Sequence, residues 1–131
     1  MPTTVIPPRL VALGKVLILA REEVVAALLG LMVELRGSQP RFLGRAELAQ
    51  DAILREMPIA VLIDYDYPDC GDELLEAVRK VGAVPILFSP FRIPSEVESF
   101  ARRHGVRSFT LPTDIETFGK VLGNQPGGSS A

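Results

Sequence analysis

The chain has 131 residues, 47% of them hydrophobic and 23% charged, which suffices for one globular domain with a sizeable core. Its net charge of -2 provides no basic surface, so we expect no direct nucleic-acid binding by this domain. One cysteine, Cys70, excludes an internal disulfide and is typical of a reducing cytoplasm. The longest apolar stretch, residues 24–33, is too short to span a membrane. We therefore predict a cytoplasmic protein.

Three regions follow one another along the chain. Residues 1–14 contain three prolines and scattered apolar side chains, and we predict an irregular N-terminal arm there. Residues 15–122 are predicted to form a single domain. Residues 123–131 have the composition of a flexible tail or linker.

Within the domain, strand-like and helix-like segments alternate. The predicted strands are residues 15–20, 41–44, 59–64, 84–89 and 106–111. The predicted helices are residues 22–36, 46–57, 69–81, 94–104 and 113–122. This alternation predicts an α/β fold, a doubly wound parallel sheet of the flavodoxin-like (βα)5 type with strand order 2-1-3-4-5. No Gly-rich phosphate-binding loop follows the first strand, and we expect no enzymatic activity.

The central strand carries a carboxylate, Asp64, to its C-terminal end, the edge at which open α/β sheets bind ligands. Pro68 follows Asp64 by four residues. This segment resembles the phospho-acceptor strand of the response-regulator receiver family, in which an aspartate is followed at that spacing by proline. The resemblance covers residues 15–122. It implies a module of two-component signal transduction.

The resemblance also assigns positions at the ends of other strands. The family has Thr or Ser at the end of the fourth strand, where this chain has Ser89. Phe109 approximates the aromatic switch residue of the last strand. In place of the acidic pair that holds Mg²⁺ stand Ala20 and Arg21, and in place of the conserved lysine stands Leu111.

A carboxylate accepts a phosphoryl group only when a metal ion and an ammonium group offset the negative charge. The resemblance therefore implies a degenerate member, a pseudo-receiver in which Asp64 goes unused and no cofactor is bound. Because the first and third strands are predicted neighbours, Arg21 is predicted to pair with Asp64 or Asp66 and to replace the metal as counter-charge.

The first predicted helix is unusually apolar, since no charged residue lies between Glu23 and Glu34. One helical stripe is predicted to face the sheet: Val24, Ala27, Leu28, Leu31 and Leu35. A second stripe beside it is the candidate interface: Val25, Leu29, Met32 and Val33. Exposed apolar stripes are typical of interfaces.

Two interpretations of the candidate interface remain open. It forms a symmetric homodimer, with Ala26 and Gly30 allowing close helix approach, or the apolar N-terminal arm folds over it. We favour the homodimer.

Three functions are compatible with these features. The first is a receiver-like module that acts through protein contacts in signalling or transcription regulation, with an output domain or a histidine kinase as partner. The second is a working receiver that a histidine kinase phosphorylates on Asp64 with Mg²⁺, where Ser89 contacts the phosphoryl group. The third is a flavodoxin-like domain that binds a small molecule through Arg21, Asp64, Tyr65 and Ser89.

Overall fold

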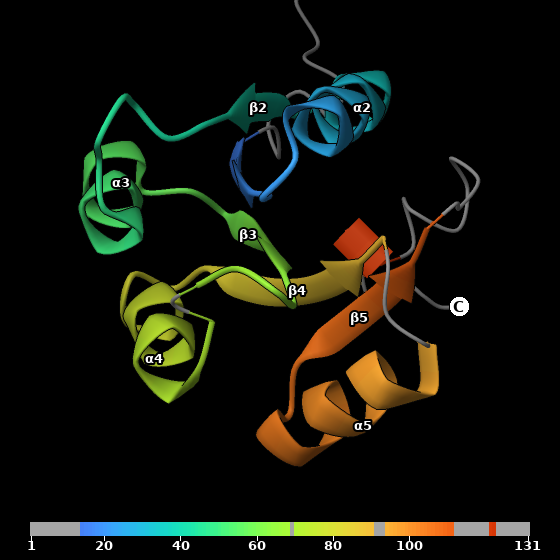
Figure 1. Ribbon diagram of the computed structural model, residues 1–131. Helices are drawn as coiled ribbons and strands as arrows, with labels where there is room; N and C mark the ends of the chain where they lie inside the picture. The colour runs from blue at the N-terminus through green and yellow to red at the C-terminus, as the bar shows by residue number, and fades with distance from the viewer. Residues whose placement is uncertain (1–13, 69, 91–93, 112–120, 123–131) are drawn as a thin grey trace, which may run out of the picture.

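The computed structural model describes residues 14–68, 70–90, 94–111 and 121–122 (Figure 1). Five parallel strands form one sheet in the order β2-β1-β3-β4-β5. The strands are β1 (Lys15–Leu19), β2 (Gln39–Arg41), β3 (Ala60–Asp64), β4 (Val84–Ser89) and β5 (Arg107–Thr110). The described helices are α2 (Glu23–Leu35), α3 (Ala49–Glu56), α4 (Asp72–Lys80) and α5 (Pro94–His104). The predicted fold class and strand order are confirmed.

Most predicted elements lie where they were expected, and β4 and α5 match to the residue. The second strand differs, because it pairs with β1 from Gln39 to Arg41 rather than beginning at Arg41. The arm, the tail and most of the predicted fifth helix lie outside the described residues. No helix in the described part has the length and apolarity needed to cross a membrane.

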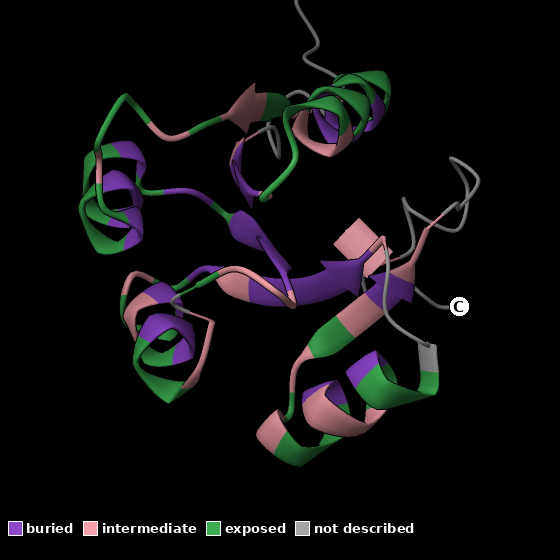
Figure 2. Cartoon of the chain, in the orientation of Figure 1, coloured by how far each residue is buried: buried purple, intermediate pink, exposed green. Residues whose placement is uncertain are grey.

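Side chains alternate between the two faces of the sheet, and each face has its own buried core. Figure 1 shows α2 on one side of the sheet and α3, α4 and α5 on the other. On the α2 side the strands contribute Val16, Ile18, Ala60, Leu62, Ile86, Phe88 and Phe109. On the opposite side they contribute Leu17, Leu19, Val61, Ile63 and Leu87. The central strands are therefore covered on both faces, as Figure 2 shows.

The orientation predicted for the first helix was wrong, because the two stripes have exchanged places. Leu29, Met32 and Val33 are buried against the sheet and Val25 is half-buried, so these four residues form no exposed interface. The opposite stripe is exposed instead: Val24, Leu28, Leu31 and Leu35.

A contact within the chain accounts for this orientation. A Cβ atom at Gly30 would lie 2.9 Å from the Cζ of Phe42 and 3.7 Å from the Cβ of Pro40. The missing side chain at Gly30 thus makes room for β2 and the ring that follows it. Gly30 was predicted to allow a second helix to approach α2. In the structure it allows α2 to pack closely against β2 and Phe42 of its own chain.

Alanine substitutions on the two stripes should have different costs. Leu29→Ala should lower the free energy of unfolding by about 2–4 kcal/mol, because it leaves a cavity in a closed core. Leu31→Ala, a matched change on the exposed stripe, should cost about 1 kcal/mol or less. Urea denaturation of both variants measures the difference, and equal losses would contradict the observed orientation.

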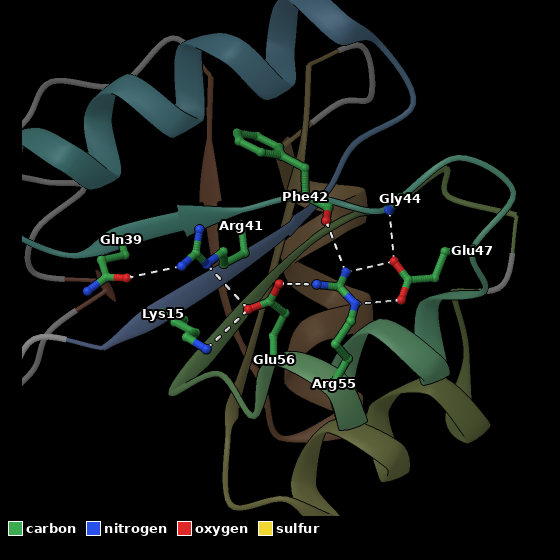
Figure 3. A network of polar contacts seen from close by, with 8 residues as sticks. All are labelled: Lys15, Gln39, Arg41, Phe42, Gly44, Glu47, Arg55 and Glu56. Atoms are coloured by element: carbon green, nitrogen blue, oxygen red, sulfur yellow. Dashed lines mark hydrogen bonds and ion pairs between the residues drawn. The ribbon is translucent and has the colours of Figure 1, made fainter.

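A buried glutamate fastens the end of α3 to the sheet (Figure 3). Glu56 is only 8% exposed and pairs with three cations. Its Oε1 lies 3.4 Å from Lys15 Nζ in β1 and 3.3 Å from Arg41 Nε in β2, and its Oε2 pairs with Arg55. This ion cluster ties α3, β1 and β2 together near the start of β1.

The loop before α3 is held by the same arginine. Arg55 pairs with Glu47 at 2.7 Å and donates to the carbonyl oxygen of Phe42. The hydrogen bond from Arg55, together with one from the Gly44 amide, lowers the pKa of Glu47 to about 2. Glu47 therefore stays ionised at all ordinary pH values, and the loop is tied to the helix that follows it.

Removing the charge of Glu56 should destabilise the fold. Glu56→Gln leaves three cations close together around a neutral side chain, and we expect a loss of about 1–3 kcal/mol in the free energy of unfolding. Glu76→Gln on the exposed side of α4 is the control and should change stability much less. Chemical denaturation at neutral pH gives both values; similar losses in the two variants would contradict the anchoring role of Glu56.

Candidate functional site

Asp64 is the last residue of β3 and is only 2% exposed. Both oxygens of its carboxylate accept backbone hydrogen bonds. Oδ1 accepts the N–H of Asp66 at 2.9 Å, and Oδ2 accepts the N–H of Arg21 at 3.2 Å. The carboxylate thus closes the turn that follows β3 and also joins it to the loop between β1 and α2.

The predicted ion pair of Arg21 was wrong. Among the described residues its guanidinium pairs with neither Asp64 nor Asp66, and its side chain is exposed. The contact with Asp64 is made by the backbone amide of residue 21, which any amino acid other than proline supplies. Arg21 therefore provides a hydrogen-bond donor at this edge, but no counter-charge inside it.

Ser89 ends β4 beside Asp64 at the same edge of the sheet. Asp64 lies opposite Phe88 in the register of β3 and β4, so Ser89 stands one residue further along. Ser89 is also buried, at 5% exposed. The two positions that match the receiver pattern therefore lie at the same edge of the sheet, at the ends of neighbouring strands.

The positions on the last strand have an apolar environment. Phe109 lies opposite Phe88, its ring stacks on the Phe88 ring with centroids 5.6 Å apart, and it is 6% exposed. Leu111 packs against the same buried cluster. An apolar side chain thus occupies the place where the resemblance would require an ammonium group.

The residues that the structure describes at this edge do not fit a magnesium ion. Magnesium requires near-octahedral oxygen ligands from fixed positions. Among the three positions that hold the metal in the receiver pattern, only Asp64 supplies a carboxylate, because Ala20 offers no side-chain oxygen and Arg21 carries a positive charge. Within the described residues there is no group of three or more His, Cys, Asp or Glu side chains that could hold a metal ion.

The pKa of the Cys70 thiol is affected by the burial and the charges at this edge. Burial, followed by the negative charges of Asp64 and Asp66, raises the pKa of Cys70 to about 11. A site rich in offsetting cations would lower the pKa of a neighbouring thiol. The surroundings of Cys70 are therefore partly closed to water and include the carboxylates of Asp64 and Asp66.

A chain of aromatic contacts links the turn after Asp64 to α5. The ring of Tyr65 meets that of Phe100 edge-on, with centroids 5.3 Å apart. Phe100 lies 4.2 Å from the His104 ring, and His104 Nδ1 lies 3.1 Å from a carboxylate oxygen of Asp72 in α4. Arg79 of α4 also donates to the carbonyl oxygen of His104 at 2.6 Å. The sequence prediction missed this contact between Phe100 and His104. Their spacing of four residues, which places two side chains on the same face of a helix, could have indicated it.

The cavity between the N-terminal ends of α3 and α4 has a volume of about 520 Å³. It is lined by Leu48, Ala49, Gln50, Asp51, Pro68, Cys70, Gly71, Asp72, Glu73 and Leu74. None of Arg21, Asp64, Tyr65 and Ser89 is among these residues. This cavity therefore gives no support to a small-molecule site built from those four side chains.

Solved structures with the same architecture include several receiver domains. The signal receiver domain of a modulated diguanylate cyclase from Desulfovibrio desulfuricans G20 has a TM-score of 0.63 at 19% identity, over 81% of this chain and 87% of that one. A response regulator receiver domain protein from Clostridium thermocellum has a TM-score of 0.65 at 14% identity, over 81% and 88%. The chain has the receiver-domain fold.

Receiver-like folds also occur within longer proteins. NtrX from Brucella abortus, solved in complex with ADP, has a TM-score of 0.65 at 20% identity and matches 80% of this chain. This chain spans 24% of the length of NtrX. Comparison of the sequence with protein-family models and with curated proteins finds no match. At these low identities, the structural likeness defines the fold alone.

The reactivity of Cys70 tests the description of this edge. With its pKa raised to about 11, the thiol should react slowly with iodoacetamide at pH 8, and the rate should rise until about pH 11. Asp64→Asn removes one of the negative charges and should speed the reaction at pH 8 about two- to threefold. Glu98→Gln on α5 is the control. Half-maximal reactivity near the pH of a free thiol would contradict the closed, negative site.

Proposed function

We propose that this chain is a receiver-like signalling module that acts through protein–protein contacts and does not undergo standard magnesium-dependent phosphorylation on Asp64. One observation carries the proposal: both oxygens of the buried acceptor carboxylate are bound by backbone amides, with no described cation beside them. Its partners would be proteins of a two-component pathway, either an output domain or a histidine kinase. The domain would contact no nucleic acid directly.

Electrostatics supports this proposal. A phosphoryl group on Asp64 would bring additional negative charge to an edge that already carries the carboxylate of Asp66. Two like charges 4 Å apart repel by about 4 kcal/mol at an effective dielectric constant of 20. Receiver domains offset such repulsion with a metal ion and an ammonium group, whereas this chain has Ala20, Arg21 and Leu111 at those positions.

The contacts around Tyr65 suggest how such a module could transmit a signal. Tyr65 follows Asp64 directly, and its ring packs on Phe100 of α5. A partner that moves α5 would therefore displace the turn beside Asp64, and a partner bound at the turn would displace α5. This coupling needs no covalent modification.

The juxtaposition of Asp64 and Ser89 favours one alternative, a working receiver. In that case a histidine kinase would phosphorylate Asp64, Ser89 would contact the phosphoryl group and Phe109 would report its presence. This alternative requires counter-charges that the described residues at the site do not supply.

Phosphoryl analogues separate the two functions. The protein with Mg²⁺ and beryllofluoride should give an unchanged ¹H–¹⁵N spectrum, and its intact mass should stay the same after incubation with acetyl phosphate and Mg²⁺. A Mg²⁺-dependent spectral change, or a gain of one phosphoryl group that Asp64→Asn abolishes, would support the working receiver and contradict the proposal.

A variant that restores the missing charges provides the positive control. Ala20→Asp, Arg21→Asp and Leu111→Lys together supply two carboxylates and an ammonium group at the strand ends. We expect the triple variant to gain a Mg²⁺-dependent response to beryllofluoride, because Asp64 and Ser89 already lie at the same edge of the sheet on neighbouring strands. Adding Asp64→Asn to the triple variant should remove the response.

A further inference from the structure

The outer stripe of α2, defined as Val24, Leu28, Leu31 and Leu35, is an apolar surface without a cover in the described part of the chain. These side chains are 81%, 46%, 54% and 66% exposed. They are spaced by four, three and four residues, the spacing by which one face of a helix packs against an apolar partner. An exposed surface of this kind is typical of a docking site.

We propose that the outer stripe is the docking site of the chain's own N-terminal arm, residues 1–13. The arm would cover the stripe as an extended segment that runs along α2 from its C-terminal end toward its N-terminal end. This proposal does not depend on whether Asp64 is phosphorylated, and it replaces the interface predicted on the opposite stripe.

The arm joins the described chain beside one end of the stripe. The carbonyl oxygen of Gly14 accepts the N–H of Gln39 at 3.0 Å, and Gln39 lies only four residues beyond Leu35, the last residue of α2. The chain that precedes Gly14 therefore begins close to the C-terminal end of α2.

The arm is long enough to reach the other end of the stripe. From Leu35 to Val24 the helix axis advances about 16 Å, at 1.5 Å per residue. An extended chain covers that distance in about five residues, at roughly 3.3 Å each. The thirteen residues of the arm could extend by about 43 Å, which suffices to pass around α2 from the sheet and to run along the stripe. They include five Val, Ile or Leu side chains: Val5, Ile6, Leu10, Val11 and Leu13.

The charges on the two segments are complementary. Glu22 and Glu23 are exposed at the N-terminal end of α2. The arm contains one charged side chain, Arg9, and no acidic residue. An arm docked along the stripe therefore brings a cation to a helix whose N-terminal end carries two exposed carboxylates. Three prolines in the arm favour an extended backbone and lower the entropy lost on docking.

A second copy of the chain fits the stripe less well than the arm does. Four aliphatic side chains present on the order of 100 Å² each, so two copies would bury roughly 800 Å² through their stripes. A stable interface buries about 1,200–2,000 Å² in total. The arm needs no such area, because it is already tethered beside the stripe. A partner helix that binds the stripe would have to displace the arm first, so the arm would lower the affinity of that partner.

Thiol labelling of the full chain tests this proposal. In a Cys70→Ser background, Leu31→Cys places one reporter in the middle of the outer stripe, and Leu28→Cys provides a second reporter. Arg102→Cys on the exposed side of α5 is the matched control away from the stripe. Maleimide labelling rates are measured with the natural arm, with Leu10→Ser/Val11→Ser in the arm, and with Arg9→Glu. Circular dichroism confirms folding of each variant, and sedimentation gives its mass.

With the natural arm, we expect the stripe reporters to react about tenfold more slowly than the control, as an arm docked nine-tenths of the time requires. Both arm changes should restore fast labelling, and salt should weaken the protection in the natural arm because Arg9 contributes to it. Fast labelling of both reporters with the natural arm would overturn the proposal. Slow labelling that the arm changes leave untouched, in a protein of dimer mass, would overturn it in favour of a second copy.

Discussion

The hydrogen bonds to the buried carboxylate of Asp64 are the interactions on which the C-terminal edge of the central strands depends. A carboxylate with so little exposure must have both oxygens hydrogen-bonded, and here two backbone amides from two different loops do so. The same side chain that would accept a phosphoryl group in a receiver thus holds together the turn after β3 and the loop after β1. Its two carboxylate oxygens stabilise the local structure, which gives a physical reason for an aspartate at this position even without phosphoryl transfer.

The fold could be predicted from the sequence because its signals are local and agree with one another. Helix α5 starts at Pro94 and ends just before Gly105, which adopts a positive φ of 66°, and both signals are visible in the sequence. The short apolar run from Val84 to Ser89 has the length typical of a strand buried on both faces, and it forms one. Asp64 and Ser89 were placed at one edge because parallel strands end together.

The sequence predictions were wrong where residues that are far apart in the chain determine the orientation of a helix or the partner of a side chain. Helix α2 has apolar side chains on nearly all sides, so its periodicity fits two orientations, and the contact between Gly30 and Phe42 selects one of them. The role of Arg21 was misjudged for a related reason. A sequence shows the charge of the Arg21 side chain, but it does not show that the backbone amide of Arg21, rather than its guanidinium, donates to Asp64. The link from Tyr65 to Phe100 likewise joins residues that are far apart in the sequence.

The ion cluster around Glu56 lies at the opposite end of the sheet from Asp64. Glu56, Lys15, Arg41 and Arg55 gather near the start of β1, whereas Asp64 and Ser89 lie where β3 and β4 finish. The charges that fasten helix to sheet are therefore separate from the charges that phosphoryl chemistry would require. Substitutions that change the charge at the edge near Asp64 would therefore leave intact the ion pairs that hold α3 to the sheet.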